Sequence, residues 1–385
     1  MNHVINIIAL FVAAFIFFRL IFPLPVKGRT KAWLTLALVM AASKFVITLI
    51  NPHYLASPEL PRGLLLINSW LFGALMLLFL MTVAKDALCL LVWLTRVVLK
   101  KPRSDPRRRI PIAAALALTA LAASAWAVWE AVKTPEVIRT EITLAGLPPE
   151  LDGLTIVQLS DQHISRLLPR PRTERTVEIT NALNPDLILV TGDVADGYLS
   201  LRADDVAPMT ALRAKYGVYG CVGNHEYYSG FDQWLAALSG LGLTMLYNSH
   251  QTLNINGADL VLAGVADPVG ASPRFNLPGP DPRAALAGKP EGAPVILLAH
   301  QPKNAAAYAA LGPDLILSGH THGGIIRGFD RVVAAFNHGY VAGLYQVGAT
   351  QLYVNRGTGL WNGFPLRLGV PGEISLLTLR TERGV

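Results

Sequence analysis

The stretch Leu315-Ile316-Leu317-Ser318-Gly319-His320-Thr321-His322-Gly323-Gly324 is the most informative part of this 385-residue chain. A short apolar run, typical of a buried strand, ends there in two histidines two residues apart. Three glycines flank the histidines and let the backbone approach a site closely, and paired histidines are common metal ligands. The stretch therefore predicts a buried strand that ends at a metal site.

Four other short apolar runs end in residues of the same kind. They are Thr155–Ser160 before Asp161-Gln162-His163, Leu187–Thr191 before Gly192-Asp193-Val194-Ala195-Asp196, Val218–Val222 before Gly223-Asn224-His225-Glu226, and Val295–Ala299 before His300. Because active sites of α/β folds form where buried strands end, the five endings predict one common site. Five of the nine histidines of the chain lie in these motifs, which favours a site that uses imidazole.

Each motif also has a structural alternative when it is taken alone. If the strand continued through Asp161 and His163, both side chains would point the same way and could hold one ion, yet the pair could equally form a turn. Asp193 or Asp196 could cap a helix. Gly-Asn is an ordinary turn signal, and His300 could bond only to backbone. Five such endings in one chain favour the metal site over five separate structural roles.

In this order the motifs resemble the calcineurin-like metallophosphoesterase superfamily, whose pattern is Asp-x-His, Gly-Asp-x-x-Asp, Gly-Asn-His-Asp/Glu, a His and Gly-His-x-His. The likeness covers about residues 138–382. It is closest to a membrane-linked branch, the YkuE/YaeI-like proteins, through Leu159–His163, His300-Gln301-Pro302, Ser318–Gly324 and Leu352–Gly359. The α/β pattern of strands and short helices agrees with it, and the resemblance implies a four-layer α/β/β/α sandwich. Gln162 stands where a Leu is more usual and Ile325 where a Gln is frequent.

The resemblance implies a site for two divalent metal ions. The seven ligand positions would be Asp161, His163 and His322 for one ion, Asn224, His300 and His320 for the other, and Asp193 as the bridge. His225 would be catalytic, approaching the scissile phosphate with support from Asp196. Two such ions activate a bridging hydroxide as nucleophile and stabilise the charge that develops in the displacement. Nitrogen and oxygen ligands without thiolate suit Mn, Fe, Zn or Co, among which the sequence does not choose.

The first third of the chain is far more apolar than the rest. Mean hydropathy is +0.40 with 15% charged residues, as in a membrane protein that carries a globular domain. Apolar segments at about 4–24, 32–50, 64–84 and 110–132 are each near the roughly 20 residues that a spanning helix needs. We expect a transmembrane helical region over residues 1–135 and a catalytic domain over 136–385. Residues 4–24 lack the basic leading region of a signal peptide.

The third apolar segment continues with helical character past Lys85-Asp86 to about residue 98. This continuation predicts an extension of the third helix or an interfacial piece, with a fifth span as the alternative. Basic residues concentrate in the first loop, at Lys27, Arg29 and Lys31, and between Arg96 and Arg109. Because such loops stay cytoplasmic, the catalytic domain is predicted on the outer face of the cell membrane, with either number of spans.

The net charge of +7 does not require a nucleic-acid partner, because the basic residues cluster beside the apolar segments. Cys89 and Cys221 lie in separate apolar runs, so we expect two separate thiols and no disulfide. Helices are expected at 173–183 and around 234–241. Residues 268–294, rich in Pro, Gly and Ala, are expected to form a long surface loop, with a lid as the alternative.

These features predict a membrane-tethered phosphoesterase with two metal ions that hydrolyses a phosphodiester, phosphomonoester or pyrophosphate bond. Its expected partners are the lipid bilayer and a phosphorylated substrate, with a lipid or envelope intermediate as the leading candidate. The alternative is a non-catalytic metal-dependent sensor or scaffold at the membrane. The complete set of ligand positions, together with His225 and Asp196, favours the enzyme, because binding alone would not require the catalytic pair. Few charged residues lie within the apolar segments, which disfavours a transporter.

Overall fold

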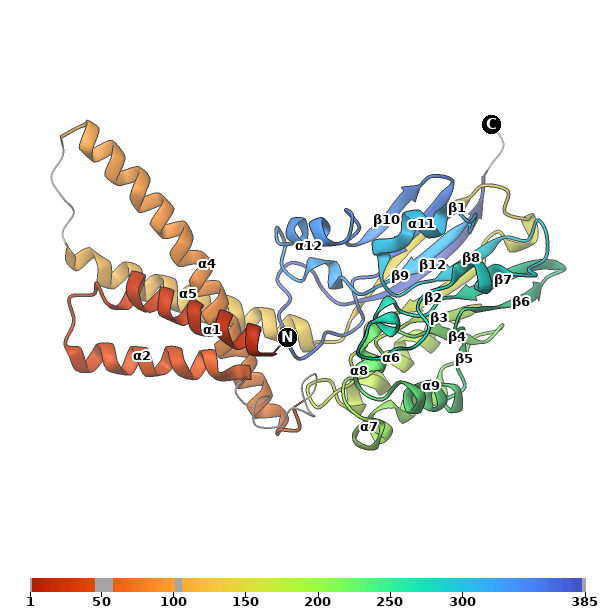
Figure 1. The fold of residues 1–385 in the computed structure, drawn as a ribbon, viewed down its shortest axis with the longest axis horizontal. Helices are drawn as coiled ribbons and strands as arrows, with labels where there is room; N and C mark the ends of the chain where they lie inside the picture. Colours follow the sequence, from red (N-terminus) through yellow and green to blue (C-terminus); the bar gives the residue numbers. More distant parts are fainter. Residues whose placement is uncertain (1, 46–57, 101–105, 383–385) are drawn as a thin grey trace. The chain divides into compact units, whose positions relative to one another are not determined.

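The computed structural model describes residues 2–45, 58–100 and 106–382. The chain divides into two compact units, Met1–Glu130 with Phe364–Leu366, and Ala131–Gly363 with Arg367–Val385. The first unit is helical and the second contains two β-sheets (Figure 1). The division falls five residues before the predicted domain boundary, near the end of the last long helix.

The helical unit is built from long apolar helices. They are α1 (Asn2–Ile16), continued by the π-helical turn η1 (Phe17–Ile21), α2 (Gly28–Ala42) with η2 (Ser43–Phe45), α4 (Arg62–Val98), and α5 (Arg109–Val132) preceded by η4 (Pro106–Arg108). The predicted third segment and its continuation form one unbroken helix of 37 residues, α4. The continuation is therefore an extension of the third helix, which is one of the predicted alternatives.

Two of these helices are long and apolar enough to cross a membrane, Arg62–Val98 and Arg109–Val132, and a shorter apolar helix covers Ile7–Ile21. They include the predicted spans 64–84 and 110–132. The predicted span 32–50 begins within α2, and residues 46–50 lie outside the described residues. The count of four spans stays a prediction.

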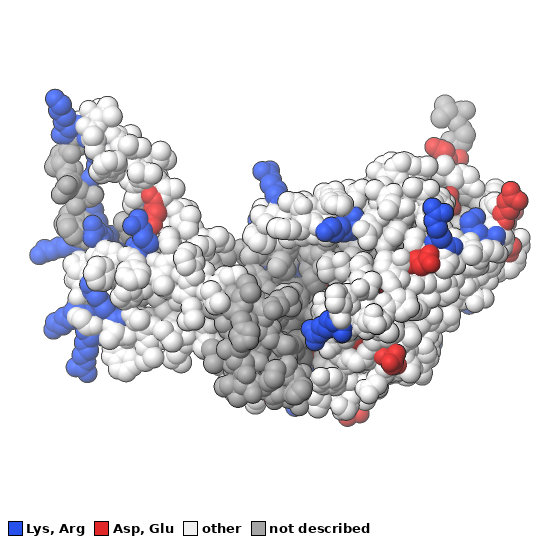
Figure 2. Space-filling view, viewed as in Figure 1, with Lys and Arg blue, Asp and Glu red and all other residues white. Residues whose placement is uncertain are grey.

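Basic side chains gather at one end of the helical unit. The turn between η1 and α2 and the start of α5 lie at this end (Figure 1), where Arg109 Nη1 donates to the carbonyl of Pro23 at 3.2 Å. Figure 2 shows that Lys and Arg predominate there over Asp and Glu. The first basic loop and the start of α5 are therefore neighbours. Lys44, buried in the unit, donates to Ser69 Oγ on α4 at 3.3 Å.

The second unit contains two six-stranded sheets. The first has the order β1 (Glu136–Leu144), β12 (Glu373–Thr381), β2 (Thr155–Leu159), β3 (Leu187–Thr191), β4 (Val218–Cys221) and β5 (Thr244–Met245). The second has the order β10 (Gly343–Val347), β11 (Thr350–Val354), β9 (Leu315–Ser318), β8 (Val295–Leu298), β7 (Ala258–Gly264) and β6 (Ser249–Ile255). Strands β2, β3 and β4 pair in parallel, as do β7, β8 and β9.

Short helices connect these strands. They are η5 (Pro149–Leu151), α6 (Arg170–Ala182), α7 (Leu199–Val206), η6 (Ala207–Ala211), α8 (Asn224–Tyr228), α9 (Phe231–Gly240), η7 (Pro268–Ala271), α10 (Pro282–Leu286), η8 (Pro302–Asn304), α11 (Ala305–Ala309), η9 (His322–Gly324) and α12 (Asp330–Phe336). Helices α6 and α9 match the two that the sequence predicts. The expected loop 268–294 contains η7 and α10, the latter capped by Asp281, which accepts the N–H of Ala284 at 2.9 Å.

The core arrangement is the predicted four-layer sandwich. Along β3, Leu187 and Leu189 join a buried cluster that holds residues of both sheets, whereas Ile188 and Val190 pack with residues of α6 and α9. Alternate side chains of a strand face opposite sides, so each sheet has one face on its partner and one on helices. The outer face of the second sheet packs on α10 and α11 in the same way.

Candidate metal centre

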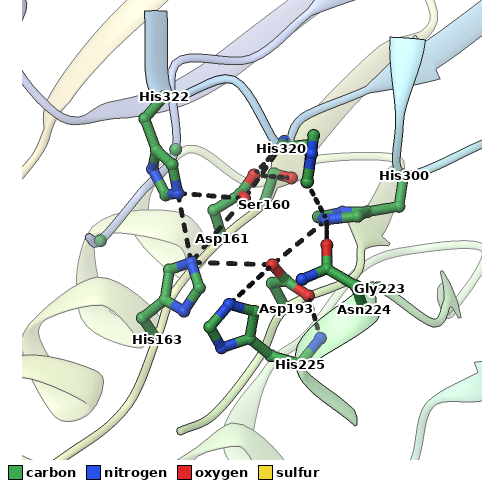
Figure 3. A network of polar contacts seen from close by, with 12 residues as sticks. Ser160, Asp161, His163, Asp193, Gly223, Asn224, His225, His300, His320 and His322 are labelled. Carbon is green, nitrogen blue, oxygen red and sulfur yellow. Dashed lines mark hydrogen bonds and ion pairs between the residues drawn. The ribbon is translucent and has the colours of Figure 1, made fainter. Parts of the chain in front are cut away.

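The turns after β2, β3, β4, β8 and β9 converge on one buried site, so segments up to about 160 residues apart supply neighbouring side chains (Figure 3). Three groups of side chains there have ligand atoms that all lie within 4.8 Å of one another. The groups are Asp161, His163 and His322, then Asp193, His300 and His320, then His163, Asp193 and His225. The structure thus brings together the predicted ligand residues, with Asn224 beside His300.

The first group comes from both sheets. His163 Nε2 and His322 Nε2 are 3.3 Å apart, and His322 Nε2 is 3.5 Å from Asp161 Oδ1. In the second group His300 Nε2 is 3.2 Å from Asp193 Oδ2 and 3.3 Å from His320 Nδ1. These ring nitrogens face one another, as ligands that surround a shared cation do.

The spacing of these atoms fits metal ions. Two ligands about 2.1 Å from a tetrahedral or octahedral ion lie roughly 3.0–3.4 Å apart, close to the shorter separations here. Asn224 Oδ1 lies 3.2 Å from His300 Nε2, so it belongs to the second group. His322 Nδ1 is buried and has no hydrogen-bond partner among the described residues, and Nε2 is the nitrogen that faces Asp161. The donor set therefore suits two divalent cations.

Backbone amides hold the carboxylates in place. The N–H of His320 donates to both oxygens of Asp161, at 2.9 and 3.1 Å, and the N–H of His225 donates to Asp193 Oδ1 at 2.8 Å. A Cβ on Gly223 would lie 2.2 Å from Asp193 Oδ1, and one on Gly319 would lie 2.2 Å from Asp161 Oδ2. Glycine stands at both positions because the ligand carboxylate occupies the space that a side chain would need.

Asp196 orients two imidazoles with one oxygen. Its Oδ1 accepts from His163 Nδ1 at 2.9 Å and from His225 Nδ1 at 2.6 Å. His300 is fixed similarly, since its Nδ1 donates to the carbonyl of Thr191 at 2.7 Å. A carboxylate or carbonyl on Nδ1 sets the tautomer that leaves Nε2 as the inward atom. All three rings therefore present Nε2 to the centre.

Burial and neighbouring charges shift the pKa values of these groups. Burial lowers the pKa of His320 to about 4, with a further contribution from the charge of His300. Burial and the neighbouring His163 hold the pKa of His322 well below its usual value. Both imidazoles are thus neutral at pH 7 and offer lone pairs. Burial would lower the pKa of His225 as well, but Asp193 and Asp196 outweigh it and raise that pKa to about 9.

One supporting residue received no role from the sequence. The buried carboxylate of Glu226 accepts three backbone N–H groups, from Asp193 at 3.0 Å, Val194 at 2.8 Å and Gly223 at 2.7 Å. It ties the turn after β3 to the turn after β4. Its place directly after His225 was the available signal, but the amides of Asp193 and Val194 belong to a turn that only the fold brings close to Glu226.

Arg367 is a second residue of this kind. It is fully buried, and its Nη2 donates to the carbonyls of Arg356, Gly357 and Gly359 at 2.7–3.0 Å. These carbonyls belong to the loop that passes behind His322, because a Cβ on Gly357 would lie 2.6 Å from His322 Nδ1. No motif in the sequence marks this arginine.

Several structural alternatives are now decided. Asp161 and His163 have φ angles of 50° and 45°, so the chain forms a turn there and does not continue as a strand. The turn nevertheless points both side chains inward. The next helix after Asp193 and Asp196 begins at Leu199 with Tyr198 before it, so neither aspartate caps it. Both cysteines are free thiols, as predicted.

Two aromatic residues beside the centre differ in their surroundings. Tyr227 stacks on Phe231 with ring centroids 4.4 Å apart and is buried in the core. Tyr228 meets the ring of His225 edge to face at 5.4 Å, and Phe275 of the 268–294 segment lies 5.9 Å from Tyr228. That segment therefore reaches the rim of the site.

Comparison with known proteins identifies the class. The calcineurin-like phosphoesterase family model matches residues 154–324, which include all five motifs. The chain belongs to the calcineurin-like metallophosphoesterases, a family of metal-dependent phosphoesterases.

Relatives of the chain carry the same domain. The Bacillus subtilis "Uncharacterized metallophosphoesterase YkuE" is 33% identical over 253 residues, 63% of this chain and 85% of that protein. The bovine "Transmembrane protein with metallophosphoesterase domain" is 37% identical over 288 residues, 72% of this chain and 64% of that protein. The chain thus spans slightly less than two thirds of the bovine protein's length. Among solved structures, the calcineurin-like phosphoesterase YfkN from Bacillus subtilis has a TM-score of 0.38 at 20% identity, covering 54% of this chain and 82% of that one.

Proposed function

We propose that this protein is a membrane-tethered hydrolase with a two-metal centre that cleaves a phosphodiester, phosphomonoester or pyrophosphate bond. The observation that carries the proposal is the convergence of five strand ends on one buried cluster of nitrogen and oxygen ligands. Asp161, His163 and His322 would hold one ion, Asn224, His300 and His320 the other, and Asp193 would bridge them. Two bound cations activate a water nucleophile and stabilise the charge that develops on the phosphoryl oxygens.

His225 would act on the substrate rather than on the metals. Its Nε2 lies 3.9 Å from Asp193 Oδ2, farther than the corresponding atom of His300, and its Nδ1 is held by Asp196. The charge of Asp196 stabilises the imidazolium form, which carries a proton on Nε2. That proton can be donated to the leaving oxygen or hydrogen-bonded to the phosphoryl group. Asp196 would stabilise the cationic ring throughout.

The helical unit would hold the enzyme at a bilayer. Support comes from the two helices of spanning length and from relatives named as transmembrane proteins. Basic side chains at one end of the unit support a cytoplasmic position for that end (Figure 2). Because α5 starts at this end and the catalytic unit follows α5 in the chain, we propose an outer position for the catalytic unit. A tethered phosphoesterase is best suited to a substrate at the membrane, so we propose a phosphorylated lipid or envelope intermediate.

The test is hydrolysis of an aryl phosphodiester and an aryl phosphomonoester by the full chain in detergent. The protein is stripped of metal and then resupplied with Mn, Fe, Zn or Co. Activity should return with metal and disappear in Asp193→Asn, whereas Asp232→Asn on the exposed surface of α9 should match the wild type. Equal activity in Asp193→Asn and wild type would overturn the proposed centre. A protein that binds two ions but hydrolyses nothing would support a metal-dependent sensor instead.

A further inference from the structure

Exposed apolar side chains of the sheet-containing unit concentrate in one short segment. Among described residues 131–382, six large hydrophobic side chains are exposed, and four of them fall between residues 329 and 344. They are Phe329 at 45%, Val332 at 45%, Phe336 at 72% and Leu344 at 42%. Scattered single apolar residues are normal on a protein surface, but a cluster of them usually marks an interaction site.

Three of these side chains share one side of α12. Phe329, Val332 and Phe336 are spaced by three and four residues, which places them on one face of the helix. We call these three residues the α12 face. No residue of α12 is buried, so the helix contributes almost nothing to the core of its own unit. Its apolar residues are therefore available for another surface.

The helix is fixed to the candidate metal centre. It follows the loop of the proposed ligand His322, and a Cβ on Gly324 would lie 2.5 Å from the Cα of Asp330, the first residue of α12. Two short backbone bonds link the segment, from the Ile326 N–H to Gly324 at 2.6 Å and from the Phe329 N–H to Ile326 at 2.9 Å. A surface bound by α12 is therefore held close to the metal loop.

The sequence around α12 matches a lipid surface. Interfacial helices combine large apolar side chains on one side with Arg or Lys beside them, and Arg327 and Arg331 flank the α12 face. Anionic headgroups attract such basic residues.

The connection between α5 and the sheet-containing unit is short. Only three residues, 133–135, separate the end of α5 from the start of β1, and they can span about 10 Å at most. Near the end of α5, Trp126 and Trp129 are exposed and lie 4.8 Å apart. Tryptophans at this position of a spanning helix are typical of the membrane–water interface. If α5 spans a bilayer, the sheet-containing unit starts at its surface.

We propose that the α12 face docks onto the lipid bilayer surface and brings the metal centre to phosphoesters in the headgroup layer. The second half of this statement rests on the proposed function, whereas the docking itself does not. Phe329, Val332 and Phe336 enter the headgroup region, and Arg327 and Arg331 contact anionic lipid.

The test uses the full chain in nanodiscs of mixed phosphatidylcholine and phosphatidylglycerol, in a Cys89→Ser background that keeps the buried Cys221. An environment-sensitive fluorophore is attached at Phe336→Cys, and in a control protein at Gln251→Cys. Gln251 is an exposed residue of β6, far from α12 in the same unit (Figure 1). Lipids with a spin label near the headgroup should reduce emission at position 336 at least about twofold and leave position 251 nearly unchanged.

Three outcomes would overturn the docking. The two positions could be quenched equally. Position 336 could be shielded without lipid quenching, which would mean that helices of the same chain cover it. Its shielding could depend on the protein-to-lipid ratio, which would mean that a second copy covers it.

A triple variant, Phe329→Ser, Val332→Ser and Phe336→Ser, should lose the lipid quenching of a label at Leu344→Cys and retain aryl phosphoester hydrolysis. If the wild-type protein did not hydrolyse aryl phosphoesters at all, that result would contradict the proposed function but not the docking.

Discussion

The two sheets supply different halves of the candidate metal centre. The turns after β2, β3 and β4 of the first sheet contain all of its carboxylates, Asp161, Asp193 and Asp196, and its amide, Asn224. The turns after β8 and β9 of the second sheet contribute only imidazoles, His300, His320 and His322. One half is therefore anionic and the other neutral or cationic.

The halves also differ in how they are held. The carboxylates of the first sheet accept backbone N–H groups, as Asp161 does from His320 and Glu226 does from three amides. Among the histidines of the second sheet, His300 has a strong backbone bond, but its acceptor is Thr191 of the first sheet. The imidazole half thus depends on the anionic half for its geometry. Metal binding should consequently require both sheets to be stacked.

The largest effect should come from the histidine that joins the halves. In His300→Ala the bond to Thr191 is lost, and with it the nitrogen 3.2 Å from Asp193. We expect loss of one equivalent of metal and a fall in aryl phosphoester turnover on the order of 10⁴, since a bound cation contributes several kcal/mol to the transition state. Metal content is measured by elemental analysis beside turnover. His338→Ala, at an exposed histidine, is the control. Two full equivalents in His300→Ala would contradict its ligand role.

Turnover should also fall when His225, the histidine of the anionic half that is proposed to act on the substrate, is replaced. His225→Ala should reduce turnover by roughly 10²–10⁴ while metal content stays near two equivalents, as for a lost proton donor. Asp196→Asn should reproduce part of this fall, because it removes the carboxylate that stabilises the His225 cation. The ratio of metal content to turnover distinguishes this pair from His300. Loss of both ions in His225→Ala would make it a ligand instead.

Much of this arrangement could be predicted from the sequence. Each metal-ligand motif follows a short apolar run, so strand ends and ligand identities are local features of the chain. The resemblance to a known superfamily supplied the sandwich and the order of ligands. The long helix α4 was also visible as apolar sequence that continues past Lys85.

The supporting contacts were not visible, because they join distant segments. The carboxylate of Glu226 is bonded by amides more than 30 residues earlier, and Arg367 holds carbonyls of a loop without a motif. The sequence left open whether Asp161 and His163 continue the strand or form a turn, and the positive φ angles that decide for a turn are unusual outside glycine. The apolar side chains of α12 gave no signal until their exposure was known.

A smaller effect is expected from the glycine that gives Asp193 its space. In Gly223→Ala the new methyl group would meet Asp193 Oδ1 at 2.2 Å, which forces the carboxylate to move. We expect metal affinity to fall roughly 10- to 100-fold, the size seen when the groups that orient a ligand are disturbed. Titration of the stripped protein with Mn measures it. Gly240→Ala has open space around its Cβ and no positive φ, so its affinity should equal that of the wild type. Equal affinities in the two variants would show that Asp193 tolerates displacement.

The smallest effect should appear only as a change in stability with pH. Asp267 lies beside the imidazole half, where its carboxylate accepts from Gln301 Nε2 at 3.0 Å and from the Val269 N–H at 2.8 Å. Burial raises its pKa to about 6. An acid whose pKa is higher in the folded state binds more protons when folded, so its contribution to stability is lost as pH rises from about 4 to about 6. In the metal-free protein, this loss should be roughly 2–3 kcal/mol.

Asp267→Asn cannot titrate, so the thermal midpoint of the chelated wild type, measured relative to that of the variant in the same detergent, should fall as the pH rises from 4 to 7. The comparison removes contributions from other groups, which both proteins share. Metal should reduce the difference, because cations near His300 favour the ionised Asp267 and lower its pKa. Parallel midpoints at every pH, with and without metal, would mean that folding does not raise the pKa of Asp267.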